Sequence, residues 1–137
     1  MPKYCYCCNT PFQLLHKFYS RLCPVCATEN YQNRFRSTDL NGRNVLLTGG
    51  RVKIGYATAL KFLRANAKLL ITTRFPALAM QQISKEPDFK KWQNQLTVYG
   101  LDLRNIKAVN NFITYANKHF HSLDILVNNA AQTIKYT

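Results

Sequence analysis

The fold of this chain is decided by the stretch Asn44-Val45-Leu46-Leu47-Thr48-Gly49-Gly50-Arg51-Val52-Lys53-Ile54-Gly55. The apolar run from Val45 to Thr48 predicts a buried strand, which ends abruptly at a pair of glycines. After Gly55 the spacing of apolar residues becomes helical and predicts a helix that runs to about Asn66. A strand, a glycine turn and a helix in this order place backbone N–H groups and a helix N-terminus against a phosphate.

The segments after this helix continue to alternate between strand and helix patterns. Apolar runs predict three further strands, at 69–73, 96–99 and 123–131. Helical patterns predict three further helices, at 77–85, 88–93 and 106–120. The expected core face of the last helix consists of Ile106, Val109, Ile113, Ala116 and Phe120. The alternation predicts an α/β fold with a parallel sheet of about four strands.

Three of the predicted strand ends carry short motifs. The first combines Thr48-Gly49 with Ile54-Gly55, the second is Asp102-Leu103, and the third is Asn128-Asn129-Ala130-Ala131. In this order they resemble the short-chain dehydrogenase/reductase family over residues 40–137, with its turn T-G-x-x-x-G-x-G and its motif N-N-A-G. Lys53 replaces the middle glycine of the turn, where it either hinders cofactor approach or aims a cation at phosphate. Alanine replaces the last glycine of N-N-A-G.

The resemblance implies a truncated Rossmann-type domain at residues 43–137 with a dinucleotide site at the strand ends. In such folds an acid at the end of the second strand holds the ribose 2′-OH of NAD. This strand instead ends in Thr72-Thr73-Arg74, and a guanidinium favours NADP(H), unless Arg74 is simply a solvated loop residue. Arg51 is expected to reach the same 2′-phosphate. The predicted cofactor-binding residues are Gly49, Arg51, Lys53, Ile54, Gly55, Arg74, Asp102, Leu103, Asn129 and Ala130.

No catalytic residue is predicted in this chain. The family uses a Ser and a Tyr-x-x-x-Lys pair beyond the Asn-Asn-Ala strand, where the lysine lowers the pKa of the tyrosine. Tyr136 has no lysine four residues later, and Lys135 precedes it. We therefore expect a truncated or split relative of these NADP-dependent oxidoreductases, inactive as this 137-residue chain. A sheet that stops at its fourth strand has an open edge. Either a protein partner or self-association covers this edge, or the fold is only marginally stable, or the natural protein is longer.

The N-terminal region contains two C-x-x-C pairs. Cys5 and Cys8 form the first pair, and Cys23 and Cys26 form the second after a gap of 14 residues. Four thiolates at this spacing predict a structural zinc site in a zinc-ribbon-like module at residues 1–28, with disulfides or an iron–sulfur cluster as the alternatives. Because the module is too short for a core of its own, metal would have to stabilise it. Cys7 is interpreted as a neighbour of the site.

Aromatic and basic residues are interleaved around the cysteine pairs. Their rings suit stacking on the bases of single-stranded nucleic acid, or they pack the module onto the next domain. The second function considered is therefore a non-catalytic binding module, for nucleic acid or a protein, with a degenerate Rossmann half-domain. Polar residues at 29–42 predict a linker between the two parts. The interleaved residues are Tyr4, Tyr6, Phe12, His16, Lys17, Phe18, Tyr19, Arg21, Tyr31, Arg34, Phe35 and Arg36.

Charge and hydropathy narrow the function classes further. The chain has 19 Lys and Arg residues against 6 Asp and Glu, a formal net charge of +13, which favours polyanionic partners such as a phosphate-rich cofactor or nucleic acid. No apolar run reaches the length of a membrane span, and the N-terminus has no hydrophobic signal core. These features predict a cytoplasmic protein, in which cysteines stay reduced and free to bind metal.

Overall fold

The computed structural model describes residues 2–131. Contacts along the chain divide it into two compact units, Met1–Thr38 and Asp39–Thr137. We call them the cysteine unit and the α/β unit and describe each by itself. Residues 132–137, which include Lys135 and Tyr136, lie outside the described part.

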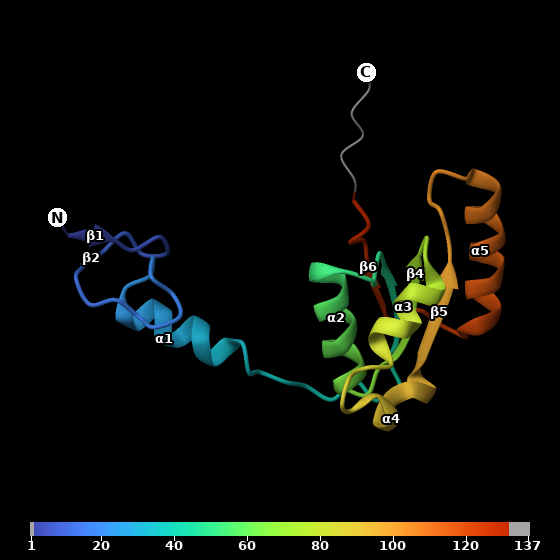
Figure 1. The fold of residues 1–137 in the computed structure, drawn as a ribbon, viewed down its shortest axis with the longest axis horizontal. Coiled ribbons are helices and arrows are strands. Elements are labelled where there is room, and N and C mark those ends of the chain that lie inside the picture. The colour runs from blue at the N-terminus through green and yellow to red at the C-terminus, as the bar shows by residue number, and fades with distance from the viewer. Residues whose placement is uncertain (1, 132–137) are drawn as a thin grey trace, which may run out of the picture. The chain divides into compact units, whose positions relative to one another are not determined.

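The cysteine unit consists of a small hairpin and one helix (Figure 1). Strands β1 (Lys3–Tyr4) and β2 (Pro11–Phe12) pair antiparallel. Helix α1 (Pro24–Asn33) begins directly after Cys23, with proline at its start, where the missing N–H costs nothing. The helix therefore includes residues 29–33, the first part of the predicted linker. Only Cys5, Phe12, Cys23 and Ala27 are buried hydrophobic residues among the described part of this unit.

The α/β unit is built on a four-stranded parallel sheet, which confirms the predicted fold class. Its strands are β3 (Asn44–Thr48), β4 (Lys68–Thr73), β5 (Leu96–Gly100) and β6 (Ile125–Val127), in the order β5-β4-β3-β6. Strand β3 pairs with β4 on one side and with β6 on the other. The chain thus winds outward from β3 in one direction and then returns to its other side. Such a reversal opens a crevice at the carboxyl ends of the strands.

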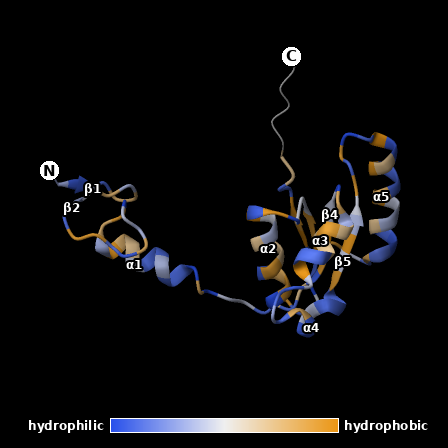
Figure 2. Ribbon diagram, viewed as in Figure 1, coloured by the Kyte–Doolittle hydropathy of each residue, from blue (hydrophilic) through white to orange (hydrophobic). Residues whose placement is uncertain are grey.

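Helices cover both faces of this sheet (Figure 1). Helix α2 (Lys53–Arg64) joins β3 to β4, and α3 (Pro76–Ile83), α4 (Phe89–Trp92) and a 3-10 turn, η1 (Gln93–Gln95), lead from β4 to β5. Helix α5 (Ile106–His119) connects β5 to β6. Alternate strand residues face opposite layers: Leu47, Leu69 and Ile71 join the cluster with α2, whereas Leu70 joins the cluster with α5. The central strands accordingly appear hydrophobic in Figure 2.

The predicted core face of α5 is wrong at two positions. Ile106 is 72% exposed and Ile113 is 50% exposed, while Phe112 is buried. The helix is rotated toward its aromatic residues because Phe112 packs on Tyr99 of β5, with ring centroids 4.9 Å apart. An aromatic ring buries more apolar area than an isoleucine side chain does, so it determines which face meets the sheet.

The start of α5 and the last strand also differ from the sequence interpretation. Asp102 precedes the helix predicted at 106–120, and aspartate is a residue type that commonly caps a helix, so the sequence favours a cap at this position. The cap is instead Asn105, whose side-chain oxygen accepts a 3.0 Å hydrogen bond from the N–H of Ala108. Strand β6 was expected to be buried, but Leu126 is 53% exposed. Among the described residues, β6 pairs only with β3 and forms an edge of the sheet.

Candidate functional site

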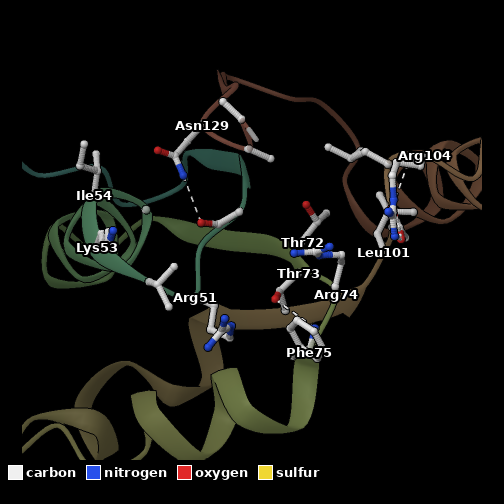
Figure 3. A pocket seen from close by; sticks show the side chains of 17 residues that line it. Arg51, Lys53, Ile54, Thr72, Thr73, Arg74, Phe75, Leu101, Arg104 and Asn129 are labelled. Atoms are coloured by element: carbon white, nitrogen blue, oxygen red, sulfur yellow. Dashed lines mark hydrogen bonds and ion pairs between the residues drawn. The ribbon is translucent and has the colours of Figure 1, made fainter. Parts of the chain in front are cut away.

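A cavity of about 510 Å³ lies at the carboxyl ends of the parallel strands. Four segments line it: the turn after β3, the end of β4, the end of β5 and the segment after β6 (Figure 3). The ends of β4 and β5 lie on one side of β3, where the strand order reverses, and the segment after β6 lies on the other side. All ten predicted cofactor residues line this one cavity, together with Val52, Thr72, Thr73, Phe75, Leu101, Arg104 and Ala131.

The turn after β3 requires glycine at two positions. Gly49 has φ +73°, and a Cβ there would lie 3.1 Å from the Cα of Ala130. A Cβ on Gly55 would overlap the carbonyl oxygen of Gly49. Glycine allows the first turn of α2 to pass directly against the end of β3, so the strand and the helix N-terminus come together at the cavity.

Thr48 and Asn129 fasten this turn to the segment after β6. The N–H groups of Asn129 and Ala130 each donate a 3.0 Å hydrogen bond to Oγ1 of Thr48. The Asn129 side-chain amide donates to the carbonyl oxygens of Thr48 and Gly49, at 3.2 and 3.1 Å (Figure 3). The amide therefore satisfies two carbonyl oxygens at the start of the turn and fixes the turn to the segment after β6.

The turn presents free backbone donors. The N–H groups of Gly49 and Gly50 both donate to the carbonyl oxygen of Thr72 on β4. From Arg51 to Gly55, in contrast, no backbone N–H has a hydrogen-bond partner within residues 2–131. Unpaired N–H groups at the start of a helix, together with the helix dipole, form a site for a phosphate.

Lys53 adopts an uncommon backbone conformation in this turn. Its φ is +50°, in the left-handed region that glycine occupies without strain. This is the position at which the family's turn has its middle glycine. The turn has therefore kept the backbone geometry of a glycine turn although a lysine occupies the position.

Two arginines flank one aromatic ring at the end of β4. The guanidinium carbons of Arg51 and Arg74 lie 5.3 and 5.6 Å from the centroid of the Phe75 ring (Figure 3). Neither guanidinium has an ion pair with a carboxylate in the described part of the chain. Two cations beside one half-exposed ring and without a carboxylate leave this corner of the cavity positively charged.

Asp102 and Arg104 form a closed pair after the end of the adjacent strand β5. Nε and Nη2 of Arg104 contact both carboxylate oxygens of Asp102, the shortest distance being 2.6 Å. Hydrogen bonds from the Arg104 side chain and backbone lower the pKa of Asp102 to about 2. The carboxylate is therefore ionised at neutral pH, and its charge is neutralised by its own neighbour.

Sequence reasoning missed Phe75 and Arg104, although both follow a predicted residue closely. Phe75 is adjacent to Arg74, and an aromatic ring beside an arginine at a strand end is a signal for cation–π packing. Arg104 stands two residues after Asp102, within reach of its carboxylate. In both cases the resemblance to the family predicted the first residue of the pair and not the second, which contacts it.

The cysteine unit contains a second candidate site. The Sγ atoms of Cys5, Cys8, Cys23 and Cys26 all lie within 4.8 Å of one another. Sγ of Cys8 and Sγ of Cys23 are 3.7 Å apart, much farther than the roughly 2 Å of a disulfide bond. A tetrahedral zinc ion with bonds of about 2.3 Å to sulfur needs sulfur–sulfur distances of about 3.8 Å. The cluster thus matches the geometry of a four-thiolate metal site, and Cys7 lies outside it.

Comparison with known proteins identifies the family of the α/β unit. Residues 43–137 match the family described as short chain dehydrogenase, and the chain belongs to this family. The NADP-dependent 3-hydroxy acid dehydrogenase of Schizosaccharomyces pombe is 30% identical over 92 residues, 66% of this chain and 35% of that protein. A structure of ElxO with NADP bound superimposes with a TM-score of 0.56 and 34% identity, covering 67% of this chain and 36% of that one.

A further relative extends across both units. The uncharacterized protein R665 of Acanthamoeba polyphaga mimivirus is 39% identical over 135 residues, 95% of this chain but 29% of that protein. The chain therefore spans about a third of the length of these relatives. No helix in residues 2–131 is long and apolar enough to cross a membrane.

Proposed function

We propose that the α/β unit binds NADP(H) in the cavity at its strand ends, as the cofactor-binding half of a short-chain dehydrogenase/reductase. The pair of arginines on Phe75 carries this proposal. An NAD site needs an acceptor for the ribose 2′-OH at the end of β4, whereas Arg51 and Arg74 supply donors and positive charge for a 2′-phosphate. The NADP named with ElxO and with the yeast dehydrogenase supports the same cofactor.

The remaining cavity residues would each contact a different part of the dinucleotide. The free N–H groups from Arg51 to Gly55 would bind the pyrophosphate, and Lys53 adds a cation at this turn. Asp102 and Leu103 would contact the adenine, and Asn129 would hold the turn in place through its hydrogen bonds to the carbonyl oxygens of Thr48 and Gly49. Bound NADP(H) would supply a site of hydride transfer.

This chain provides no proton donor for that chemistry. No tyrosine of the 137-residue sequence is followed by a lysine four positions later, so the Tyr-x-x-x-Lys pair of the family is absent. We therefore propose a cofactor-binding part of an oxidoreductase that does not turn over a carbonyl substrate as this chain. A protein partner or a second copy at the edge of β6, where Leu126 is exposed, would complete the sheet.

Calorimetric titration of the chain with NADPH and with NADH tests the cofactor assignment. We expect NADPH to bind more tightly, and the substitutions Arg51→Ala and Arg74→Ala together to weaken NADPH binding by roughly 10- to 100-fold, since each removes charge-assisted hydrogen bonds. The double variant should leave NADH binding nearly unchanged. The matched control is Lys90→Gln with Lys91→Gln, which removes two charges from α4 outside the cavity. Equal affinity for both dinucleotides would refute the 2′-phosphate role.

The sulfur cluster supports a second component, a structural zinc ion in the cysteine unit. The proposal that metal ligation, rather than apolar burial, holds this unit together is supported by four sulfur atoms within 4.8 Å of one another and by a buried core of only four described residues. Four thiolates leave no open coordination position, so the ion would have no catalytic role. Metal analysis of the purified chain should give one zinc per chain, and a chain with Cys23→Ser and Cys26→Ser should give none.

A further inference from the structure

The cysteine unit has a groove of its own, of about 430 Å³, on the hairpin side. The groove is shaped by backbone contacts: β1 pairs with β2, and the N–H of Tyr6 donates a 3.0 Å hydrogen bond to the carbonyl oxygen of Arg21. These bonds bring the hairpin and the segment before Cys23 to the same surface. The residues that line the groove are Lys3, Tyr4, Tyr6, Phe12, Ser20 and Arg21.

The rings of this unit separate into two groups with different environments. Five rings pack on one another around the end of α1, namely His16, Phe18, Tyr19, Tyr31 and Phe35. Tyr4 and Tyr6 take no part in this cluster or in any other ring contact within residues 2–131. Tyr4 is 63% exposed and Tyr6 is 85% exposed. Phe18, Tyr31 and Phe35 are also exposed, at 54%, 40% and 68%, but each of them contacts another ring. The two groove tyrosines therefore differ from the first group in having no ring partner within residues 2–131.

The charges along the groove are of one sign. Lys3 and Arg21 are exposed and form no ion pair with a carboxylate in the described residues. No acidic residue lines the groove, and Glu29 on α1 is the only acidic residue in the sequence from 1 to 38. A groove with two exposed rings between two unpaired cations offers stacking surfaces together with attraction for a negatively charged backbone.

We propose that this groove, formed by Lys3, Tyr4, Tyr6 and Arg21, binds single-stranded nucleic acid. The tyrosines stack on unpaired bases, which present flat faces whatever their sequence, and the two cations contact the phosphates. Duplex nucleic acid hides its bases in the stack and offers the rings nothing to stack on. An acidic protein segment would satisfy the cations, but it offers flat faces to the rings only where it carries aromatic residues, whereas every nucleotide carries a base. The rings therefore favour a single strand over either alternative.

Fluorescence anisotropy of a labelled single-stranded oligothymidylate, titrated with the full chain at several salt concentrations, tests this proposal. We expect Tyr4→Ala with Tyr6→Ala to weaken binding by roughly 5- to 150-fold for each base that loses its ring. Replacing both tyrosines with phenylalanine retains the rings and should retain the affinity. Lys3→Gln with Arg21→Gln should reduce the slope of log affinity against log salt by about 1.4, because each lost phosphate contact contributes about 0.7 on a single strand.

Controls separate this groove from the basic cavity of the α/β unit. Arg51→Ala with Arg74→Ala, and Lys90→Gln with Lys91→Gln, each remove two cations outside the groove and should leave the affinity for the oligonucleotide within about twofold of the original. Both groove variants should bind NADPH as the original chain does. The proposal is overturned if the tyrosine-to-alanine variant binds the oligonucleotide as well as the original chain, if neither binds it, or if a duplex of the same length binds equally tightly. It is also overturned if the Arg51 and Arg74 variant alone loses binding.

Discussion

The two units of this chain obtain their folds from different sources. The α/β unit buries fifteen hydrophobic residues among those described, in clusters on both faces of a parallel sheet. The cysteine unit buries four, and two of them are the thiols Cys5 and Cys23. A chain segment of fewer than about 40 residues cannot bury enough apolar surface to offset its conformational entropy. We therefore propose that metal ligation replaces a hydrophobic core in the smaller unit.

The difference also determines what each unit can present to a ligand. In the α/β unit the sheet fixes a cavity wall by many contacts, so that a turn with free N–H groups and a strained lysine stays in place. In the cysteine unit a few backbone bonds and the sulfur cluster fix a shallow surface on which aromatic rings remain exposed. We therefore propose a small phosphate-bearing cofactor for the α/β unit and an extended polymer for the cysteine unit.

Removal of the metal should have the largest effect on stability, and this effect should be confined to the cysteine unit. We expect a chelator, or Cys23→Ser with Cys26→Ser, to unfold the cysteine unit, because binding free energy of the metal is its folding free energy. The unfolding transition of the α/β unit should not move. Amide hydrogen exchange reports both units at once, with Cys7→Ser as the control outside the cluster. Protection that persists around α1 without metal would show that the unit folds by packing alone.

Substitution of a turn glycine should produce the next largest effect, confined to the α/β unit. Gly55→Ala places a Cβ against the carbonyl oxygen of Gly49, and such overpacking costs about 1–3 kcal/mol. It should also abolish NADPH binding, because the turn has to shift. Gly42→Ala is the matched control: Gly42 has φ +78° with open space around it, so only backbone strain of about 1 kcal/mol arises and binding should persist. Urea unfolding and calorimetry measure the two effects, and equal losses of binding would contradict the steric explanation.

Sequence alone predicted most of the α/β unit because hydrophobic period and strand-end motifs are local signals. The strands and the residues that meet at the cavity follow from them, since parallel strands end at the same edge of a sheet. The burial of Phe112 in place of Ile113 could not be read in this way, because it depends on the ring of Tyr99, which is distant in sequence. The pairing of Asp102 with Arg104 was also missed. An aspartate in this turn has the same sequence pattern whether it caps a helix or pairs with an arginine.

The cysteine unit was predictable to a different extent. The spacing of the four cysteines indicated that their sulfur atoms would meet, and they do. The division of the aromatic residues into a cluster of rings in mutual contact and two tyrosines without a ring partner among the described residues was not visible in the sequence, where all the rings alternate with cations. Which rings pack depends on the direction in which α1 leaves the cysteine pair, and the sequence period of so short a unit does not specify it.

Lys53→Gly should produce a smaller effect, which raises the stability of the α/β unit and lowers its affinity for NADPH. Glycine accepts φ +50° without strain, so we expect the α/β unit to gain up to about 1 kcal/mol of unfolding free energy. The loss of the cation should nevertheless weaken NADPH binding several-fold. Lys53→Ala is the comparison, since it removes the charge and keeps the strain. If both variants bind NADPH more tightly than the original chain, Lys53 obstructs the cofactor and does not assist it.

Lowering the pH should produce the smallest change in stability per residue. It tests the contribution of the ion pairs of the α/β unit separately from the contribution of its apolar core. A hydrogen bond from Arg64 lowers the pKa of Asp88 well below its ordinary value, with Nε of Arg64 2.7 Å from the carboxylate. A depressed folded-state pKa stabilises the protein above the unfolded-state pKa of about 3.9, and this contribution is lost as the pH falls toward the folded value. At pH 7 Asp88→Asn should therefore lower the unfolding free energy by about 1 kcal/mol or less, as the guanidinium is partly exposed.

The difference between this variant and the original chain should shrink as the pH falls below about 4, because protonation removes the same charge that the substitution removes. Urea midpoints of the α/β unit at pH 7, 5 and 3 measure the trend. Glu29→Gln is the control, since it removes one carboxylate from the cysteine unit, where it forms no ion pair with another described residue. A difference that stays constant from pH 7 to pH 3 would mean that Asp88 contributes through packing and not through its charge. The Arg64–Asp88 ion pair would then contribute nothing measurable to the stability of the α/β unit, in line with the small contribution expected of a partly exposed pair.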